Sequence, residues 1–288
     1  MLNIKKHEII LDKVEWEYFV CGKGKPLVIV PAFHSDITRF KPLVKYLSQY
    51  FQVILPHLPG ISNTKSLGEH SYTAKNYARF LNLFIDKLDL KDYLLAGFCL
   101  GGTIITRMLE MGLKKPSHLL IFEGIYDAKF IHLKPLYSFL KKIILQFGPE
   151  NRVLKALVEL VLHDERALTW YLKFTYGKEK NLEEVIKHQI EITKIMASRA
   201  YLEVIYDIFT THLSKEKLQF KVPTTLIYNQ YDNLIDVEPT IKGMQTIFPN
   251  SEVLRVDLTE HSPSGAISLK VVQKMIVPLE KKIIQLSK

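Results

Sequence analysis

The sequence predicts an α/β fold: a mostly parallel central sheet with helices on both faces and an all-helical cap inserted between two strands. Three observations lead to this prediction. Short apolar runs alternate with helical patterns between residues 26 and 122, which is typical of a parallel sheet covered by helices. From residue 126 to residue 218 the strand patterns stop and helical patterns fill the chain. Strand patterns resume at residue 224, so the helical block interrupts one sheet.

The first part of the chain supplies most of the expected sheet. Alternating apolar and polar residues on either side of Asp12 predict an antiparallel hairpin, whereas the uninterrupted apolar run at 26–30 predicts a strand buried on both faces. Apolar residues at helical spacing predict the helices between the later strands. In chain order, we expect strands at 7–12, 14–20, 26–30, 52–55, 93–95 and 118–122, and helices at 37–50, from 71 or 73 to 88, and up to about 111.

Residues 97–102 carry the most informative motif, Gly-Phe-Cys-Leu-Gly-Gly. A strand that turns directly into a helix places the corner residue in a strained and accessible position. Gly97 and Gly101 are the small neighbours that let strand and helix approach, and Gly102 lets the helix lie close to the sheet. The corner residue is Cys99. A lone cysteine can equally be a small buried hydrophobe, so its role depends on whether an acid and a base accompany it later in the chain.

The helical block is expected to form a cap or lid over the sheet. Its helical patterns cover 136–147, 153–162, 167–176 and a long stretch from 182 to about 213. Most of its many aromatic residues are expected in its core, and a few are expected to face a pocket. The sequence therefore divides into a first core segment at 1–125, a helical cap at 126–218 and a second core segment at 219–288.

The second core segment completes the sheet. An apolar run at 224–228 predicts a strand, a helix is expected at 239–248, and a further strand at 252–256. The chain ends in an amphipathic pattern that predicts one helix from 268 to 286.

Composition narrows the class of protein. Apolar residues make up 47% of the 288 residues, which is enough for a sizeable core. No stretch approaches the roughly 18 consecutive apolar residues of a membrane span, and the first residues lack a signal-peptide core, so a cytoplasmic location is expected. The net charge of +9 comes from lysines scattered along the chain, which predicts a solvated surface and no nucleic-acid partner. Cys21 is expected to be a bystander, and no cluster has metal-ligand spacing, so neither a metal nor a cofactor is expected.

An acid and a base follow Cys99 in the chain. A thiol that attacks an acyl carbon needs a base, and that base needs an acid to orient it. Asp232 follows the strand at 224–228 and His261 follows the last strand, so both are expected at the same edge of the sheet as Cys99. The alternative acids are Asp236, Glu123 and Asp127, and the alternative bases are His34 and His57.

With its elbow and this order of nucleophile, acid and histidine, the chain resembles the α/β-hydrolase superfamily over nearly its full length. The resemblance implies a Cys99–His261–Asp232 triad. It also implies an oxyanion hole formed by the backbone amides of Leu100 and Phe33. The chain departs from the family where residues 31–33 read Pro-Ala-Phe in place of His-Gly-x, and where Asn229 replaces the usual glycine of the acid loop.

The cysteine elbow is similar to those of dienelactone hydrolases, which lack a cap, and of polyhydroxyalkanoate synthases, which are usually considerably longer chains. The resemblance implies hydrolysis of a carboxylic ester, lactone or thioester through a thioester acyl-enzyme. The mainly apolar helical block favours a small-molecule substrate with an apolar acyl or aromatic group. Two alternatives stay open: an acyltransferase related to the polymer synthases, and a non-catalytic ligand-binding protein of the same fold. A cysteine that replaces a serine would leave the same motif.

Overall fold

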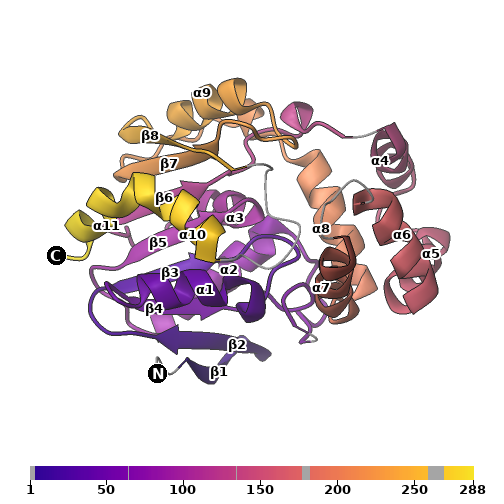
Figure 1. Cartoon of the computed structure of the whole chain (residues 1–288), viewed down its shortest axis with the longest axis horizontal. Coiled ribbons are helices and arrows are strands. Elements are labelled where there is room, and N and C mark those ends of the chain that lie inside the picture. Colours follow the sequence, from indigo (N-terminus) through magenta and orange to yellow (C-terminus); the bar gives the residue numbers. More distant parts are fainter. Residues whose placement is uncertain (1–3, 64, 134, 177–181, 259–268) are drawn as a thin grey trace.

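A computed structural model of the chain describes residues 4–63, 65–133, 135–176, 182–258 and 269–288 (Figure 1). Its centre is an eight-stranded sheet with the strand order β1-β2-β4-β3-β5-β6-β7-β8. The pairs β1–β2 and β2–β4 are antiparallel and the other neighbours are parallel, which confirms a mostly parallel sheet. The strands are β1 (Lys5–Leu11), β2 (Val14–Cys21), β3 (Pro26–Val30), β4 (Gln52–Pro56), β5 (Leu94–Phe98), β6 (His118–Phe122), β7 (Thr224–Asn229) and β8 (Ser251–Val256).

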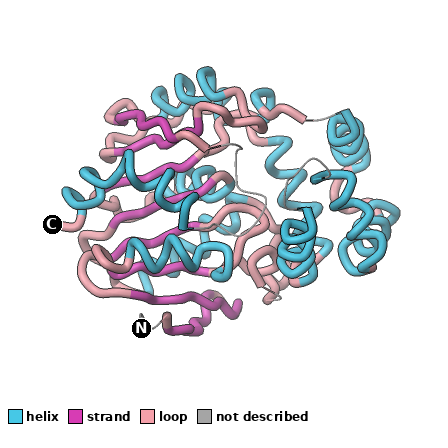
Figure 2. The backbone as a smooth tube through the Cα atoms, in the orientation of Figure 1, coloured by secondary structure: helices cyan, strands magenta, loops and turns pink. Residues whose placement is uncertain are grey.

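Helices cover both faces of the sheet, as Figure 2 shows. One face packs on α2 (Ala74–Lys87), α3 (Leu100–Glu110) and α9 (Val237–Ile247). The other packs on α1 (Ile37–Leu47), α10 (Leu269–Ile276) and α11 (Glu280–Leu286). Successive side chains of a strand point to opposite faces, and β5 follows this rule: Leu95 lies in the first core, whereas Leu94 and Ala96 lie in the second. The sheet thus separates two apolar cores.

A helical insertion separates β6 from β7. It comprises α4 (Pro135–Phe147), α5 (Arg152–His163), α6 (Glu165–Tyr176), α7 (Leu182–Lys194) and α8 (Ser198–Thr210), flanked by the short helices η1 (Ala128–Phe130) and η2 (Leu213–Lys215). The chain enters and leaves the insertion side by side: the Ala128 amide donates to the Thr211 carbonyl at 2.8 Å, and the Leu213 amide donates to the Tyr126 carbonyl at 3.1 Å. In Figure 1 the insertion forms the end of the molecule farthest from the chain termini.

Two expected helices differ from the structure. The long helix predicted over 182–213 is divided into α7 and α8, because the amide of Ala197 donates to the carbonyl of Gly60 at 2.9 Å instead of continuing a helix. The helix predicted over 268–286 is divided by the short helix η3 (Val277–Leu279). Pro278 lies in η3 and has no backbone N–H to donate, which accounts for the break. The other described elements start and end close to their predicted bounds.

Candidate active site

The turn from β5 into α3 places Cys99 at a sharp corner. Its backbone has φ 49° and ψ −110°, in a region that residues with a side chain rarely occupy. Two hydrogen bonds hold the corner: the Cys99 amide donates to the Phe122 carbonyl at 2.8 Å, and the Gly102 amide donates to the Cys99 carbonyl at 2.9 Å. The side chain of Cys99 is half-buried, whereas the strand before it is fully buried. The thiol is therefore presented from a rigid corner.

The glycines around Cys99 are required by space. A Cβ atom on Gly101 would lie 2.3 Å from the carbonyl oxygen of Val30, and one on Gly97 would lie 2.7 Å from the carbonyl carbon of Gly101. One on Gly102 would lie 3.0 Å from the Cα atom of Gly124. The start of α3 therefore touches the end of β3 and the segment after β6, which is the close approach that the motif predicts.

The two expected oxyanion donors come from neighbouring segments. Leu100 is the first residue of α3, where backbone amides point out of the helix and carry its positive partial charge. Phe33 lies in the loop that follows β3, and Gly101 packs against the Val30 and Pro31 carbonyls at the start of that loop. The ring of Phe33 lies 4.5 Å from the ring of His34 and 5.6 Å from that of Tyr201 of α8, measured between centroids.

Asp232 lies in the loop that follows β7. Its carboxylate accepts hydrogen bonds from the amides of Leu234 and Ile235, at 2.8 and 2.9 Å, so the loop fixes its orientation. The side chain is half-buried. These bonds are those of a turn residue, and they hold the carboxylate at the carboxyl edge of the sheet, where ligands bind in open α/β folds.

Two of the alternative acids are engaged by other side chains. Asp127 is buried at the junction of the insertion and accepts hydrogen bonds from His212, Ser214 and the amide of Lys129. Asp236 pairs with His132. The third alternative, Glu123, follows β6 with a positive φ of 51°, directly after the Phe122 carbonyl that binds Cys99.

A buried phenol lies among the candidate groups. Tyr228 of β7 is fully buried and donates a hydrogen bond to the Gly124 carbonyl at 2.8 Å. Burial raises its pKa well above the usual value, and the charges of Glu123, Asp232 and Cys99 act in the same direction. The structure therefore brings Cys99, Asp232 and Glu123 into the surroundings of one side chain.

His261 lies outside the described residues. The described chain before it ends at Leu258, whose amide donates to Asn229 Oδ1 at 3.0 Å. The same oxygen accepts the amide of Tyr231 at 3.1 Å. Asn229 is fully buried and so joins the loop of Asp232 to the chain that leads to His261. In the sequence, Asn229 stands out only as a departure from the family pattern, because its partner lies 29 residues away.

Of the two alternative bases, His57 is buried and His34 is half-buried, and the pKa of each lies below its usual value. His57 accepts a hydrogen bond from the Ile37 amide at 2.9 Å through Nε2, so this nitrogen serves the start of α1. Burial lowers its pKa to about 4. Burial also lowers the pKa of His34 to about 4, with a further contribution from the charge of Arg39. Its ring packs against those of Phe33 and Tyr201.

An apolar cavity lies inside the helical insertion. Its volume is about 230 Å³ and its walls come mainly from α4, α5 and α8. Tyr201 lines this cavity and also packs against Phe33 and His34, so the cavity lies next to the loop expected to supply an oxyanion donor. Among the described residues of its wall, Lys141 alone is charged. Burial lowers the pKa of Lys141, and its Nζ lies 5.0 Å from the centroid of the Phe209 ring.

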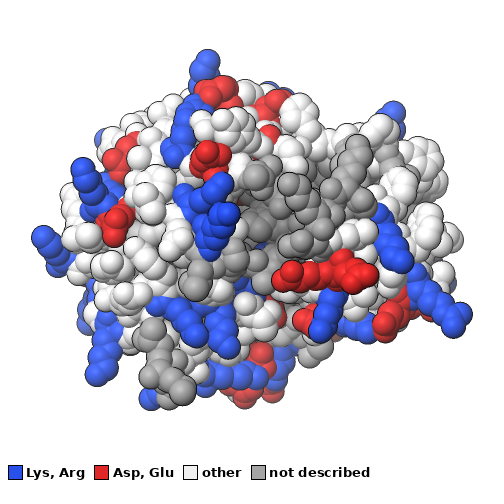
Figure 3. Space-filling model, in the orientation of Figure 1, with Lys and Arg blue, Asp and Glu red and all other residues white. Residues whose placement is uncertain are grey.

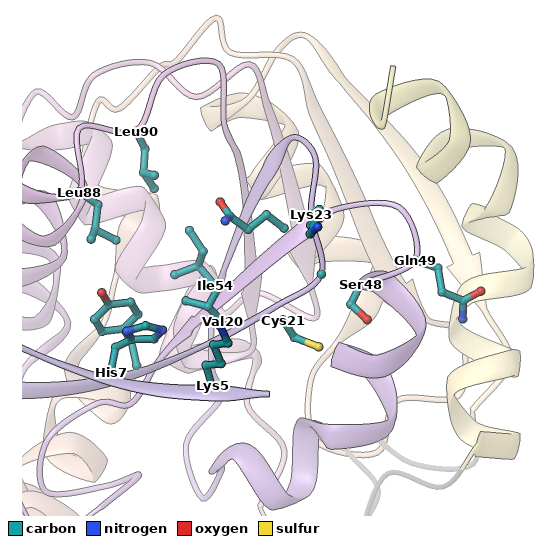
Figure 4. A pocket seen from close by; sticks show the side chains of 13 residues that line it. Lys5, His7, Val20, Cys21, Lys23, Ser48, Gln49, Ile54, Leu88 and Leu90 are labelled. Carbon is teal, nitrogen blue, oxygen red and sulfur yellow. The ribbon is translucent and has the colours of Figure 1, made fainter. Parts of the chain in front are cut away.

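The second cysteine, Cys21, lies at the amino ends of the parallel strands, opposite to the end that carries Cys99. Cys21 is buried and lines a surface cleft between β2 and the segments that precede β3, β4 and β5 (Figure 4). Lys5, His7 and Lys23 also line it. This cleft lies at the amino ends of the parallel strands, whereas ligands in open α/β folds bind at the carboxyl ends. The structure therefore separates Cys21 from Cys99.

Within the described residues, no cluster of three or more His, Cys, Asp or Glu side chains could hold a metal ion. Among the helices that the structure describes, none combines the length and the apolar character needed to cross a membrane.

Comparison with known proteins identifies several relatives. A family described as the alpha/beta hydrolase fold matches residues 25–264. The uncharacterized hydrolase YugF of Bacillus subtilis is 22% identical over 262 residues, which cover 86% of this chain and 87% of that protein. The pimeloyl-[acyl-carrier protein] methyl ester esterase of Legionella pneumophila is 23% identical over 257 residues, covering 84% and 90%. The structure of a thermophilic esterase from Thermogutta terrifontis superposes with a TM-score of 0.70 at 17% identity, covering 97% and 99%.

Proposed function

Since this chain belongs to the α/β-hydrolase family, we propose that it hydrolyses a carboxylic ester or thioester of an apolar acid, with Cys99 as the nucleophile. The observation that carries the proposal is the geometry of the elbow. Cys99 stands at a strained corner at the N-terminus of α3, with its side chain half-buried and its backbone fixed from both sides. A helix N-terminus favours a thiolate, which is the reactive form of cysteine. Nε2 of His57 is engaged by the Ile37 amide, and the pKa values of His34 and His57 are lowered to about 4, so His261 is the proposed base.

The proposed reaction has two steps. The imidazole of His261 takes the thiol proton, and the sulfur of Cys99 attacks the acyl carbon. The leaving alcohol or thiol takes that proton from the imidazole as its bond to the acyl carbon breaks, and a thioester remains on Cys99. Water then attacks this thioester, again with His261 as the base, and the acid and the free thiol are released. The amides of Leu100 and Phe33 stabilise the oxyanion in both steps.

Asp232 is the proposed orienting acid. Its carboxylate is fixed by two backbone amides in the loop after β7. Asn229 joins this loop to Leu258, and His261 is only three residues further along the chain, a reach of at most about 10 Å. The position of Leu258, held beside the loop of Asp232, therefore supports the proposed contact between His261 and Asp232.

The helical insertion is proposed to act as the cap of the site, corresponding to the expected segment 126–218. Its cavity is apolar and lies beside Phe33, so it can receive the acyl chain of a substrate whose carbonyl lies at Cys99. The related Legionella protein is named as an esterase that acts on the methyl ester of a carrier-bound pimeloyl group. This supports an acyl ester as the substrate class.

Acyl-enzyme formation tests the proposal. The protein is incubated with p-nitrophenyl esters and coenzyme A thioesters of increasing chain length, and release of the acid and intact mass are measured. We expect an acyl adduct on Cys99, and a loss of turnover of at least about a thousandfold in Cys99→Ala and in His261→Ala. Cys21→Ala is the matched control and should retain its activity, because Cys21 lies at the amino ends of the parallel strands.

The other outcomes separate the alternatives. Transfer of the acyl group to an added alcohol or thiol in preference to water would establish an acyltransferase. A thermal shift with an ester that survives Cys99→Ala, without any adduct, would establish a non-catalytic binding protein. Normal turnover in Cys99→Ala would contradict the proposed nucleophile.

A further inference from the structure

Helix α5 is apolar on both of its faces. Leu154, Val158 and Val161 line the cavity of the insertion. On the outer face, Val153 is 67% exposed and Leu160 is 58% exposed. A surface helix of a protein in water normally carries one apolar stripe, and a helix that is apolar all round is normally buried. Within the described part of the chain, the outer face of α5 is therefore apolar but exposed to solvent.

The neighbouring helices extend this apolar surface. Phe139 and Phe147 of α4 are more than half exposed. On α6, Trp170 is 70% exposed and Phe174 is 57% exposed, and their rings stack with centroids 6.1 Å apart. We call these four residues, with Val153, Leu157 and Leu160, the outer apolar face. It belongs to the end of the molecule formed by α4, α5 and α6, where uncharged atoms predominate in Figure 3.

The charges of these three helices are unbalanced. Two carboxylates are paired with lysines, Glu150 with Lys155 and Glu165 with Lys194. Glu159 accepts a hydrogen bond from the neutral Ser198 hydroxyl and keeps its negative charge, as does Asp164. The carboxylate of Asp164 caps the Ala167 amide. Four exposed cations form no ion pair within the residues that the structure describes, namely Lys142, Arg152, Arg166 and Lys173. The charge that the outer apolar face presents to a partner is therefore positive.

We propose that the outer apolar face docks on the surface of a lipid bilayer that contains anionic lipids. Exposed tryptophan and phenylalanine rings are suited to the interface between headgroups and acyl chains, and unpaired lysines and arginines are attracted to anionic headgroups. A second copy of the chain is disfavoured, because it would bring together two faces that each carry a net positive charge. The contact lies on the bilayer without crossing it.

The cavity reaches the same surface. Leu157 lines the cavity and is also 53% exposed on the outer apolar face. The wall of the cavity is thus part of the docking surface, and an apolar chain can pass from the lipid phase into the insertion without crossing water. This docking is a property separate from the proposed hydrolysis, because none of its residues lies at the elbow.

The two tryptophans of the chain give a direct test. Trp16 is fully buried in the core, so only Trp170 can report a change of solvent at the surface. Vesicles are prepared from phosphatidylcholine alone and with about one third phosphatidylglycerol. With the anionic vesicles we expect the tryptophan emission to shift to shorter wavelength and to be quenched by brominated acyl chains. Cys99→Ala should show the same response, which separates docking from catalysis.

Charge substitutions test the surface. Val153→Glu with Leu160→Glu should weaken co-sedimentation with the anionic vesicles at least about tenfold, because both side chains are exposed and neither lines the cavity. Val277→Glu is the matched control: this valine is 67% exposed, in η3, and the variant should bind like the original protein. Circular dichroism checks that each variant is folded.

Three results would overturn the proposal. The first is the absence of an emission change and of co-sedimentation with anionic vesicles. The second is equal binding by the charge variants and the original protein. The third is an emission shift that grows with protein concentration in the absence of lipid, with a matching increase in sedimentation, which would assign the face to a second copy of the chain.

Discussion

At the scale of single residues, the strain at Cys99 is maintained by the elements around it. A residue with a side chain in this backbone region costs about 1–3 kcal/mol. Hydrogen bonds from the Cys99 amide to β6 and from the Gly102 amide to the Cys99 carbonyl fix the turn between two buried elements, so a relaxed turn would have to break both. The result is a half-buried thiol held at the corner between β5 and α3.

Gly101 is predicted to be the least replaceable glycine of the elbow. In Gly101→Ala the new methyl group would lie 2.3 Å from the carbonyl oxygen of Val30, which is backbone and cannot rotate away. We expect the free energy of unfolding to fall by at least about 3 kcal/mol, measured by urea denaturation.

Gly112→Ala is the control for that measurement. Gly112 has a φ of 82° but open space around it, so alanine there should cost only about 1–2 kcal/mol, from backbone strain. Equal losses in the two variants would show that close packing is not what requires glycine at position 101.

Asn229 is predicted to support both stability and turnover. Its side-chain oxygen accepts the amides of Tyr231 and Leu258, and the residue is fully buried. Asn229→Ala leaves both amides without their acceptor and should lower the free energy of unfolding by about 2–4 kcal/mol. Asn229→Asp keeps an acceptor oxygen and should lose less stability and less esterase activity. Asn250→Ala, at an exposed turn, is the control; if all three variants behave alike, Asn229 does not join the two loops.

The residues of the site differ in how far the sequence reveals them. Cys99 and its glycines can be found from the sequence because the motif is local: strand, corner and helix follow within ten residues. The role of Asn229 cannot, because it depends on a partner beyond the next strand. His34 and His57 lie at strand ends like a catalytic base, and only the structure shows that Nε2 of His57 is used by the Ile37 amide.

At the scale of elements, α8 ties the helical insertion to the core. The Glu203 carboxylate accepts the Tyr72 amide at 2.7 Å and the Arg199 guanidinium at 2.6 Å. One turn later, Asp207 accepts the Ala74 amide at 2.8 Å, at the first residue of α2. Asp207 thus satisfies an amide in the first turn of α2 that the helix itself cannot satisfy, and Glu203 binds the chain just before that helix. The insertion is therefore fixed to the core by its last helix.

Glu203→Ala is expected to loosen this attachment. Glu203 is 4% exposed, so its loss leaves a buried amide and a guanidinium without their acceptor. We expect a loss of about 2–4 kcal/mol in the free energy of unfolding and faster cleavage of the insertion in limited proteolysis. Glu184→Ala, on the exposed side of α7, should change neither. Unchanged proteolysis in Glu203→Ala would mean that α8 is held by its apolar contacts alone.

The strands and most helices can be predicted from local patterns, whereas the two breaks within predicted helices were missed. Apolar spacing predicts where the strands and most helices lie. The division between α7 and α8 comes from the bond between the Ala197 amide and the Gly60 carbonyl, a partner far earlier in the chain. The break at Pro278 was visible in the sequence, but the amphipathic pattern continues across it and favours one helix.

At the scale of the whole molecule, three histidines with lowered pKa values link stability to pH. Burial lowers the pKa of His34, His57 and His118 to about 4 in each case. They lie in separate parts of the fold: His57 binds the start of α1, His34 packs on α8, and His118 bonds to Thr225 between β6 and β7. Protonation of any of them would place a charge in a packed region.

The sign of the pH dependence comes from these values. The usual pKa of histidine is about 6.5, and the folded values lie below it, so the unfolded chain takes up protons first as the pH falls. The contribution of these histidines to the free energy of unfolding is therefore fully present above about pH 6.5. It is lost progressively as the pH falls from 6.5 to 4. Each histidine contributes a slope of about 1.4 kcal/mol per pH unit within this range. Carboxylates whose pKa values are lowered, such as Asp127 and Glu216, act at more acidic pH, so the two effects are separable.

Urea denaturation at pH 7, 6 and 5 tests this linkage. We expect the free energy of unfolding to fall with a slope that approaches 4 kcal/mol per pH unit when all three histidines act, so a domain of ordinary stability would unfold near pH 5. His118→Asn removes one of the three groups and should reduce the slope by about one third. It should also lower the free energy of unfolding at pH 7, because the hydrogen bond to Thr225 is lost. A flat profile between pH 7 and 5 would mean that the histidines accept protons in the folded state, and the packing around them would then have to admit water.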